Sequence, residues 1–224
     1  MIQLTDVSKV FRTRRGDVAA LDGVTLHVGR GEFVVVRGPS GSGKTTLLLA
    51  IGGMLRPTRG LVVLDGRDIR ALSEPERARW RADNIGFVFQ MFHLIPYLTL
   101  LENVLLAAGG KDRRSEAEAL VERFGLADRR HHKPAELSAG EKQRAAIARA
   151  LLNGPKVILA DEPTGNLDPQ NAAGILECLA GFHEEGGTVI LATHGEGADR
   201  HASRIVLLNR GRLEEAAGTE RQNG

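Results

Sequence analysis

The chain has 224 residues, of which 42% are hydrophobic and 26% charged, with a formal net charge of +2 at pH 7. This composition is that of a globular protein, excludes collagen-like and disordered chains, and gives no indication of a polyanionic partner. The single cysteine, Cys178, excludes an intrachain disulfide, and no apolar run reaches the roughly 18 residues of a membrane span.

The first 30 residues include alternating segments, such as Thr25–Val28, and predict a small antiparallel sheet. Short apolar runs flanked by Gly and Pro then predict buried strands. These runs are Phe33–Val36, Leu61–Leu64, Ile85–Phe89, Val157–Ala160, Val189–Ala192 and Ile205–Leu208. Helical patterns lie between them, so the sequence predicts a layered α/β fold.

The stretch from about residue 96 to residue 153 differs from the rest of the chain. It contains helical patterns, including Ser115–Phe124 and Ala139–Asn153, and no convincing strand. We expect a helical insertion within a single domain that spans residues 1–224. The polar tail after Leu213 is expected to fray.

Residues 38–45 read Gly-Pro-Ser-Gly-Ser-Gly-Lys-Thr and fit the phosphate-binding loop pattern. A β-branched run precedes the loop and a helix-forming run follows it, as such a loop requires. Glycines let backbone N–H groups approach phosphate oxygens, and the following helix adds unpaired N–H groups. We expect Lys44 to contact the β- and γ-phosphates and Thr45 to hold Mg²⁺.

A second apolar run ends in two acids, Asp161 and Glu162, followed by Pro163. Two carboxylates at the end of a strand cost desolvation free energy unless a cation or a proton compensates. We expect Asp161 to hold Mg²⁺ through a water molecule and Glu162 to polarise an attacking water. Alone, this pattern is about as typical of the start of a solvated loop as of a catalytic site. Its occurrence together with the phosphate loop favours the catalytic interpretation.

Ser138 and Glu141 form a Ser-x-x-Glu capping box ahead of the helix-forming run Ala145–Leu152. A capped helix start has the polarity to face an anion. Taken alone, the motif describes an ordinary capped helix more often than a binding site.

The run Leu137–Glu141 also resembles the signature motif of ATP-binding-cassette (ABC) ATPases, and it precedes Asp161 and Glu162 in the family's order. The resemblance covers nearly the whole chain. It implies a P-loop NTPase core with a mainly parallel sheet, an N-terminal antiparallel β subdomain and an inserted helical subdomain. Three segments further resemble the macrolide-exporter and lipoprotein-releasing group: Phe92–Pro96, Leu101–Val104 and Ala160–Asp168.

The resemblance also implies residue roles. Glu162 would activate water, His194 would hold the γ-phosphate and water in line, and Gln90 would sense the metal and water. Phe11 would stack on adenine, although an apolar residue near a strand end is as often part of the core. Asp168 would line a dimer contact. The ATP-binding residues would be Phe11, Gly38, Ser40, Gly41, Ser42, Gly43, Lys44, Thr45 and Thr46, with Mg²⁺ held by Thr45, Gln90 and Asp161.

A second copy of the chain would supply its signature residues to the same γ-phosphate. These are Ser138, Ala139, Gly140 and Glu141. Two of them depart from the common family pattern: Ala139 stands where Gly is usual, and Glu141 stands where Gln is commoner. The second departure adds a negative charge near the expected triphosphate.

The resemblance implies an ATPase that forms a homodimer on binding ATP and drives an integral membrane permease or mechanotransmission subunit. It would be cytoplasmic and peripheral on the inner face of the membrane, and would act in export or in extraction of lipoproteins or lipids. The alternatives are a nucleic-acid-associated ABC ATPase and a P-loop kinase of small molecules. The first usually carries coiled-coil or zinc insertions or tandem cassettes, and the second lacks the signature, so we expect no nucleic-acid partner.

Overall fold

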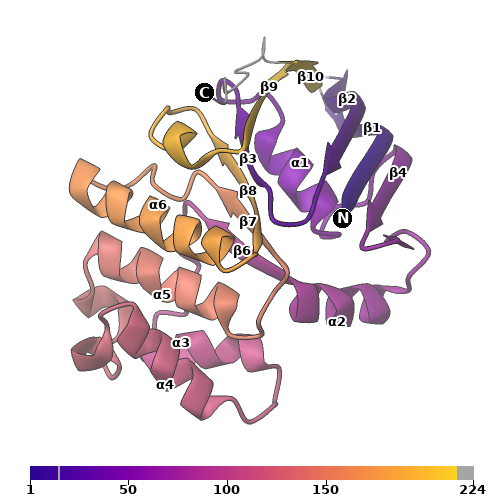
Figure 1. The fold of residues 1–224 in the computed structure, drawn as a ribbon. Coiled ribbons are helices and arrows are strands. Elements are labelled where there is room, and N and C mark those ends of the chain that lie inside the picture. The colour runs from indigo at the N-terminus through magenta and orange to yellow at the C-terminus, as the bar shows by residue number, and fades with distance from the viewer. Residues whose placement is uncertain (15, 216–224) are drawn as a thin grey trace.

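The computed structural model describes residues 1–14 and 16–215, which form two β-sheets with helices around them (Figure 1). The larger sheet has six strands, five of them parallel, and only β10 is antiparallel to its neighbour. Their order across the sheet is β10 (Arg212–Glu215), β9 (Arg204–Asn209), β3 (Phe33–Arg37), β8 (Thr188–Thr193), β7 (Val157–Asp161) and β6 (Ile85–Phe89). The mainly parallel α/β core is therefore confirmed.

The smaller sheet is antiparallel throughout, and it is larger than the sequence predicted. Its strands in order are β2 (Gly16–Val28), β1 (Ile2–Thr13), β4 (Arg59–Leu64) and β5 (Arg67–Asp68). The apolar run Leu61–Leu64 was expected among the strands that alternate with helices, and instead it pairs with β1. Burial alternates along it, with Val62 and Leu64 buried and Val63 only partly so, because one face of this sheet is covered.

The central strand β3 shows how the larger sheet is covered on both faces. Phe33 and Val35 belong to a core that includes residues of α5 and α6. Val34 and Val36 belong to a second core, shared with α1 and the smaller sheet. Successive side chains of a strand point to opposite faces, so an unbroken apolar run is what two covered faces require.

Six α-helices and four short 3₁₀ helices occur in the described residues. The α-helices are α1 (Lys44–Ile51), α2 (Glu74–Asn84), α3 (Leu100–Leu105), α4 (Arg114–Arg123), α5 (Ala139–Leu151) and α6 (Pro169–Glu184). The 3₁₀ helices are η1 (Leu106–Ala108), η2 (Ala127–Arg129), η3 (Pro134–Glu136) and η4 (Asp199–His201). Among these, no helix combines the length and apolar character of a membrane span.

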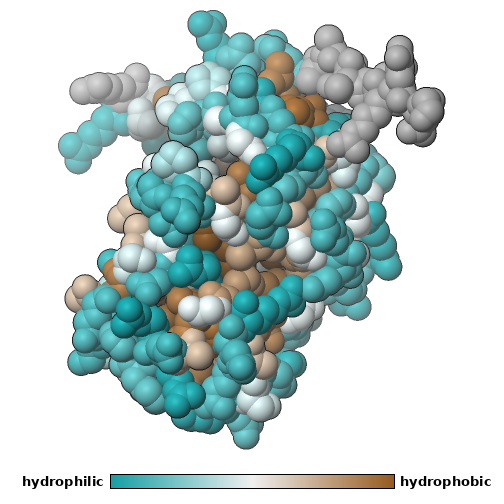
Figure 2. Space-filling model, turned by 60° about the vertical axis from the view of Figure 1, so that its left-hand side comes forward, coloured by the Kyte–Doolittle hydropathy of each residue, from teal (hydrophilic) through white to brown (hydrophobic). Residues whose placement is uncertain are grey.

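The segment between β6 and β7 contains helices alone in the described structure. Helix α5 ends at Leu151, two residues before the predicted end at Asn153. Asn153 lies beyond the end of this helix, and its side-chain amide donates hydrogen bonds to the carbonyls of Ala82 and Ala107, at 3.0 and 2.7 Å. The molecular face that includes this helical side is mostly hydrophilic, with apolar side chains in a hollow across its middle (Figure 2).

The expectation of a frayed tail after Leu213 was wrong for its first two residues. Glu214 and Glu215 continue β10, which pairs with β9. The remainder of the predicted tail, residues 216–224, lies outside the described residues.

Asn103 is a fully buried polar side chain that organises the segment before α3. Its Oδ1 accepts from the backbone N–H of Ile95 at 2.6 Å, and its amide nitrogen donates to the carbonyls of Ile95, Leu98 and Thr99 at 2.9 to 3.2 Å. We expect Asn103→Leu to lower the free energy of unfolding by about 2–4 kcal/mol, because it removes the acceptor of the Ile95 N–H and the hydrogen bonds that the amide donates to three carbonyls.

Urea unfolding measures this loss. Asn209→Leu is the matched control, because Asn209 is exposed and, among the described residues, its side chain makes one hydrogen bond, to Glu214. The control is expected to change the free energy of unfolding by less than about 0.5 kcal/mol. Equal effects of the two substitutions would show that Asn103 does not organise this segment.

Candidate functional site

Four parallel strands bring the candidate site residues to one edge of the larger sheet. The phosphate loop follows β3, Gln90 follows β6, Asp161 is the last residue of β7, and His194 follows β8. Since the carboxyl ends of parallel strands meet at one edge, residues distant in the sequence converge there. The strand pattern that predicted the fold therefore also assembles the site.

Two glycines of the phosphate loop occupy positions where no side chain fits. A Cβ on Gly38 would lie 2.1 Å from the carbonyl oxygen of Leu208. Gly43 has a φ of +107°, and a Cβ there would lie 2.3 Å from the carbonyl oxygen of Ala20. The loop is thus packed tightly against β2 and the end of β9, and its shape depends on glycine.

Lys44, the first residue of α1, places a buried ammonium group over the loop. Its Nζ donates to the carbonyls of Gly38 and Pro39, at 2.7 and 3.2 Å. The same nitrogen lies 3.3 Å from Oε1 of Glu162, and both side chains are largely buried. The positive charge of Lys44 is therefore held between the phosphate loop and the acidic end of β7.

Asp161 and Thr45 form a hydrogen-bonded pair of oxygen groups close to the Lys44 ammonium. The Thr45 hydroxyl donates to Oδ2 of Asp161 at 2.7 Å. Oδ1 of Asp161 is buried and has no hydrogen-bond partner among the described residues. Burial raises the pKa of Asp161, and the bond from Thr45 only partly offsets this. A buried carboxylate oxygen without a partner, next to a hydroxyl, fits a hard divalent cation such as Mg²⁺.

Glu162 stands in a strained backbone conformation that aims its carboxylate between two partners. Its φ is +46°, a conformation that costs free energy in a residue with a side chain. Its N–H donates to the carbonyl of Ala192 at 2.9 Å, which fixes the turn after β7 to β8. While Oε1 faces Lys44, Oε2 lies 3.0 Å from Nδ1 of His194. Glu162 thus contacts both Lys44 and His194.

Gln90 lies beside this cluster, against the turn that follows Glu162. Its Nε2 donates to Oδ1 of Asn166 at 3.4 Å, and the Asn166 amide donates to the Gln90 carbonyl at 3.3 Å. A Cβ on Gly165 would lie 2.8 Å from the Gln90 amide. No hydrogen bond in the described structure joins Gln90 directly to Asp161.

Gln143 is a site-supporting residue that the sequence reasoning missed. It is fully buried on α5 and donates to the carbonyl of Phe89 at 3.3 Å, immediately before Gln90. The signal was present in the sequence, because a glutamine on the apolar face of a predicted helix needs a buried partner. Gln143 ties the capped helix to the strand that carries Gln90.

The capping box at the start of α5 is confirmed. The Ser138 hydroxyl accepts from the Glu141 N–H at 3.2 Å, and the Glu141 carboxylate accepts from the Ser138 N–H at 2.7 Å. Ala139 is exposed at the start of α5. No hydrogen bond or ion pair joins residues 138–141 to the phosphate loop of the same chain, as far as the described residues show.

Asp168 caps α6 and lies close to the signature residues of its own chain. Its carboxylate accepts from the N–H groups of Gln170 and Asn171, both at 3.1 Å, and from the Asn171 amide at 2.6 Å. A Cβ on Gly140 would lie 2.2 Å from Oδ1 of Asn171. The starts of α5 and α6 therefore lie in contact, and a side chain at position 140 would have to displace that of Asn171.

Phe11 is not a core residue, although the sequence left that possibility open. Its side chain is 40% exposed near the end of β1, and the Lys9 ammonium lies 5.1 Å from the ring centroid. The exposed ring leaves adenine stacking as a prediction.

The family model described as ABC transporter matches residues 21–165, which include the phosphate loop, the capping box and the Asp161–Glu162 pair. The chain is a member of the ABC transporter family. It is 47% identical over 221 residues to the lipoprotein-releasing system ATP-binding protein LolD 2 of Caulobacter vibrioides, covering 96% of each chain. It is 43% identical to the macrolide export ATP-binding/permease protein MacB of Burkholderia pseudomallei, covering 95% of this chain and 33% of that protein.

Solved structures of ABC cassettes have the same fold. The dimeric structure of MJ0796, a bacterial ABC transporter cassette, matches with a TM-score of 0.89 and 42% identity over 97% of this chain and 100% of that one. Its dimeric post-hydrolysis state bound to ADP and Pi matches with the same TM-score at 40% identity, over the same shares of the two chains. The predicted family, the fold and the resemblance to the exporter and lipoprotein-releasing group are confirmed. The chain is an ATP-binding and ATP-hydrolysing subunit of an ABC transporter.

Proposed function

We propose that this ABC ATPase binds Mg-ATP between two copies of the chain and uses hydrolysis to drive a membrane partner in export or in extraction of lipoproteins. The observation that carries the proposal is the connected set of contacts from Thr45 to Asp161 and from Lys44 through Glu162 to His194. The relatives LolD 2, of a lipoprotein-releasing system, and MacB, a macrolide exporter, support the transport direction. The chain would then work as a single nucleotide-binding domain at the inner face of a membrane.

In this proposal the phosphate loop and Lys44 neutralise the β- and γ-phosphates of ATP. The buried ammonium of Lys44 would exchange its backbone carbonyl partners for phosphate oxygens, which bind a cation more strongly. Thr45 and Asp161 would hold Mg²⁺, with Gln90 reaching it from the end of β6. A bound Mg²⁺ supplies positive charge to the phosphate oxygens.

Glu162 would act as the general base for the attacking water. The left-handed backbone at Glu162 and the contact with His194 fix the carboxylate at the end of β7. A carboxylate so positioned can accept a proton from water as the water attacks the γ-phosphate. His194 would orient that water and the γ-phosphate, since its ring stands next to the base.

The start of α5 would complete the pocket of a second copy. Ser138 and Gly140 lie at the N-terminus of a 13-residue helix, where N–H groups and the helix dipole favour an anion. Ser138, Ala139 and the neighbouring Asp168 face solvent, and so are free to meet another chain. The dimeric state of the MJ0796 cassette supports this arrangement.

The dependence of hydrolysis on protein concentration tests the proposal. If two chains build each pocket, the ATPase rate per chain will rise with protein concentration below the dimer dissociation constant. We expect the total rate to increase roughly with the square of the concentration in that range. A rate per chain that stays constant down to the lowest measurable concentration would show that one chain hydrolyses ATP unaided.

Phe11 provides a separate test of the nucleotide pocket. We expect Phe11→Ala to weaken ATP binding about 5- to 150-fold, because stacking on a base contributes about 1–3 kcal/mol. The free energy of unfolding should change little, since the ring is exposed. Isothermal titration with ATP measures the affinity, and Val18→Ala is the control, because Val18 is paired with Phe11 across the hairpin and is also exposed. Unchanged affinity for Phe11→Ala would remove Phe11 from the pocket.

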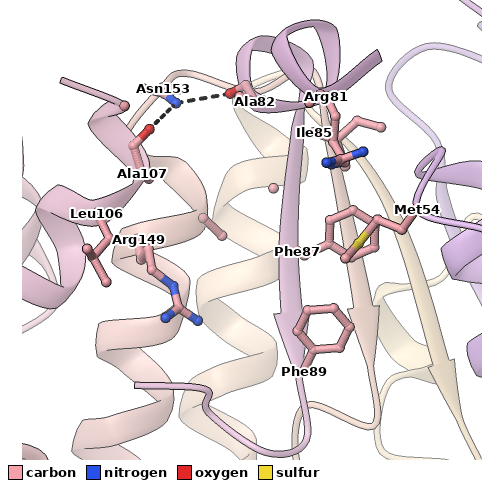
Figure 3. A pocket seen from close by; sticks show the side chains of 14 residues that line it. Met54, Arg81, Ala82, Ile85, Phe87, Phe89, Leu106, Ala107, Arg149 and Asn153 are labelled. Carbon is pink, nitrogen blue, oxygen red and sulfur yellow. Dashed lines mark hydrogen bonds between the residues drawn. The ribbon is translucent and has the colours of Figure 1, made fainter. Parts of the chain in front are cut away.

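A groove on the helical side is our candidate docking site for the membrane partner (Figure 3). It has a volume of about 440 Å³ and lies between α2, β6, η1 and α5. Phe87 and Phe89 lie along β6 with their rings stacked at 5.4 Å, Met54 is next to Phe87, and Arg149 lies across the groove. The segment from Gln90 to Tyr97 follows directly after Phe89, the last residue of β6 that lines the groove.

The charges of the groove indicate what the docking segment carries. Arg81 and Arg149 line it, and none of the described residues that line it is acidic. Arg149 donates to the carbonyls of Phe92 and His93 at 2.8 and 2.6 Å, and burial lowers the pKa of both arginines. Two partly desolvated cations among apolar side chains favour an amphipathic segment of the membrane subunit that bears a carboxylate.

A further inference from the structure

Glu141 places a negative charge in the first turn of α5, where the proposed dimer brings the triphosphate of the partner chain. Its Oε2 accepts the Ser138 N–H at 2.7 Å. This backbone hydrogen bond, with smaller contributions from the Ser138 hydroxyl and Arg129, holds the pKa of Glu141 below its usual value. Glu141 is therefore ionised at neutral pH, and an uncompensated carboxylate there would repel a γ-phosphate.

Arg129 is the cation that meets this carboxylate. Its Nε donates to the other carboxylate oxygen, Oε1 of Glu141, at 3.1 Å. The side chain of Glu141 is 19% exposed and that of Arg129 is 47% exposed, so the pair lies at the surface with its acidic half mostly covered. Both oxygens of Glu141 are thus engaged, one by the cap and one by the arginine.

Hydrogen bonds hold the backbone around Arg129 in place. The Arg129 N–H donates to the carbonyl of Leu126 at 2.9 Å, and the Arg129 carbonyl accepts from His132 at 2.9 Å. Leu126 is fully buried in the core. The next residue, Arg130, accepts from the N–H of Leu101 at 3.0 Å, which ties this turn to α3. The fold therefore fixes the backbone from which the Arg129 side chain reaches Glu141.

We propose that Arg129 is a positioning residue for the ATP-bound dimer: it neutralises Glu141 and holds it as the cap of Ser138, so that the start of α5 can approach the γ-phosphate of the partner chain. This inference rests on the proposed function, because it requires that two chains share a nucleotide. Arg129 itself touches no reacting atom and acts through Glu141. The Glu141 carboxylate caps the N-terminus of α5, and Arg129 neutralises the negative charge of that carboxylate.

ATP-dependent dimerisation tests this inference in a Glu162→Gln background, which slows hydrolysis. Sedimentation equilibrium with Mg-ATP would give the dimer dissociation constant with and without Arg129→Gln. We expect Arg129→Gln to raise this constant about tenfold, because each dimer holds two copies of the pair and each copy contributes a factor of about three. The effect should shrink at high salt, which screens exposed charges.

Two matched variants separate this role from a general loss of stability. In a Glu141→Gln background no charge remains to be neutralised, so Arg129→Gln should change the dimer constant by less than about twofold. Arg114→Gln removes a comparable ion pair, Arg114 with Glu118 at 3.1 Å on α4, and should leave dimerisation unchanged. Thermal unfolding should show similar small shifts for Arg114→Gln and Arg129→Gln.

The outcomes distinguish the inference from the proposed function. If the Glu162→Gln chain stays monomeric with Mg-ATP, the shared pocket is wrong and the role of Arg129 fails with it. If this chain dimerises and Arg129→Gln has no effect, or has the same effect in the Glu141→Gln background, only the role of Arg129 is wrong. A tenfold loss that Glu141→Gln abolishes would establish it.

Discussion

Replacing Glu162 with Gln is expected to lower the rate of ATP hydrolysis at least about 100-fold while ATP binding is retained. An amide has nearly the shape of a carboxylate and cannot accept a proton from water, and general-base catalysis contributes about 10²–10⁴ in rate. The contacts of Glu162 with Lys44 and His194 place it at the end of β7, next to the phosphate loop, where such a base is needed.

Phosphate release under single-turnover conditions measures this effect directly. Glu177→Gln is the control, because Glu177 is an exposed acid on α6 that pairs with Arg200. We expect the control to hydrolyse ATP at the rate of the unaltered chain. If Glu162→Gln retained most of that rate, another group would have to serve as the base.

The second large effect is expected for Lys44→Ala, which should weaken ATP binding by about 100-fold. The substitution removes a buried cation that would contact two phosphates, and truncating a buried charged partner typically costs about 2–5 kcal/mol. It also leaves the Glu162 carboxylate facing the phosphates without a compensating charge. Binding and hydrolysis should therefore fall together, in contrast to Glu162→Gln.

Titration with a fluorescent ATP analogue measures this affinity. Lys111→Ala is the control, because Lys111 is an exposed lysine paired with Asp83 away from the site. Its affinity should match that of the unaltered chain. An unchanged affinity for Lys44→Ala would mean that the phosphates bind elsewhere.

The parts of the site carried by contiguous motifs could be predicted from the sequence. The phosphate loop needs its glycines at fixed spacing because Gly38 and Gly43 pack against other backbones. The capping box is local too, since Ser138 and Glu141 lie within one helical turn. The convergence of Asp161 with the loop followed from a parallel sheet, whose strands all end at one edge.

What the sequence did not predict depends on contacts between distant segments. Gln143 reaches the backbone of Phe89, 54 positions away, and Arg149 reaches that of His93, 56 positions away. The local sequence pattern of α5 does not predict these partners. The strand at Leu61–Leu64 was assigned to the wrong sheet because a short apolar run is compatible with either one or two covered faces, and only pairing with β1 decides.

The site as a whole predicts that ATP joins two chains, because Ser138 and Ala139 are exposed at the start of α5 and the fold matches that of the dimeric MJ0796 cassette. The mass in solution of the Glu162→Gln chain, measured by light scattering with and without Mg-ATP, is the most direct test. We expect twice the mass of one chain with Mg-ATP, the mass of one chain without it, and no dimer when Ser138→Arg is added, although ATP still binds. A chain that binds Mg-ATP fully and keeps the mass of a monomer would contradict the shared pocket.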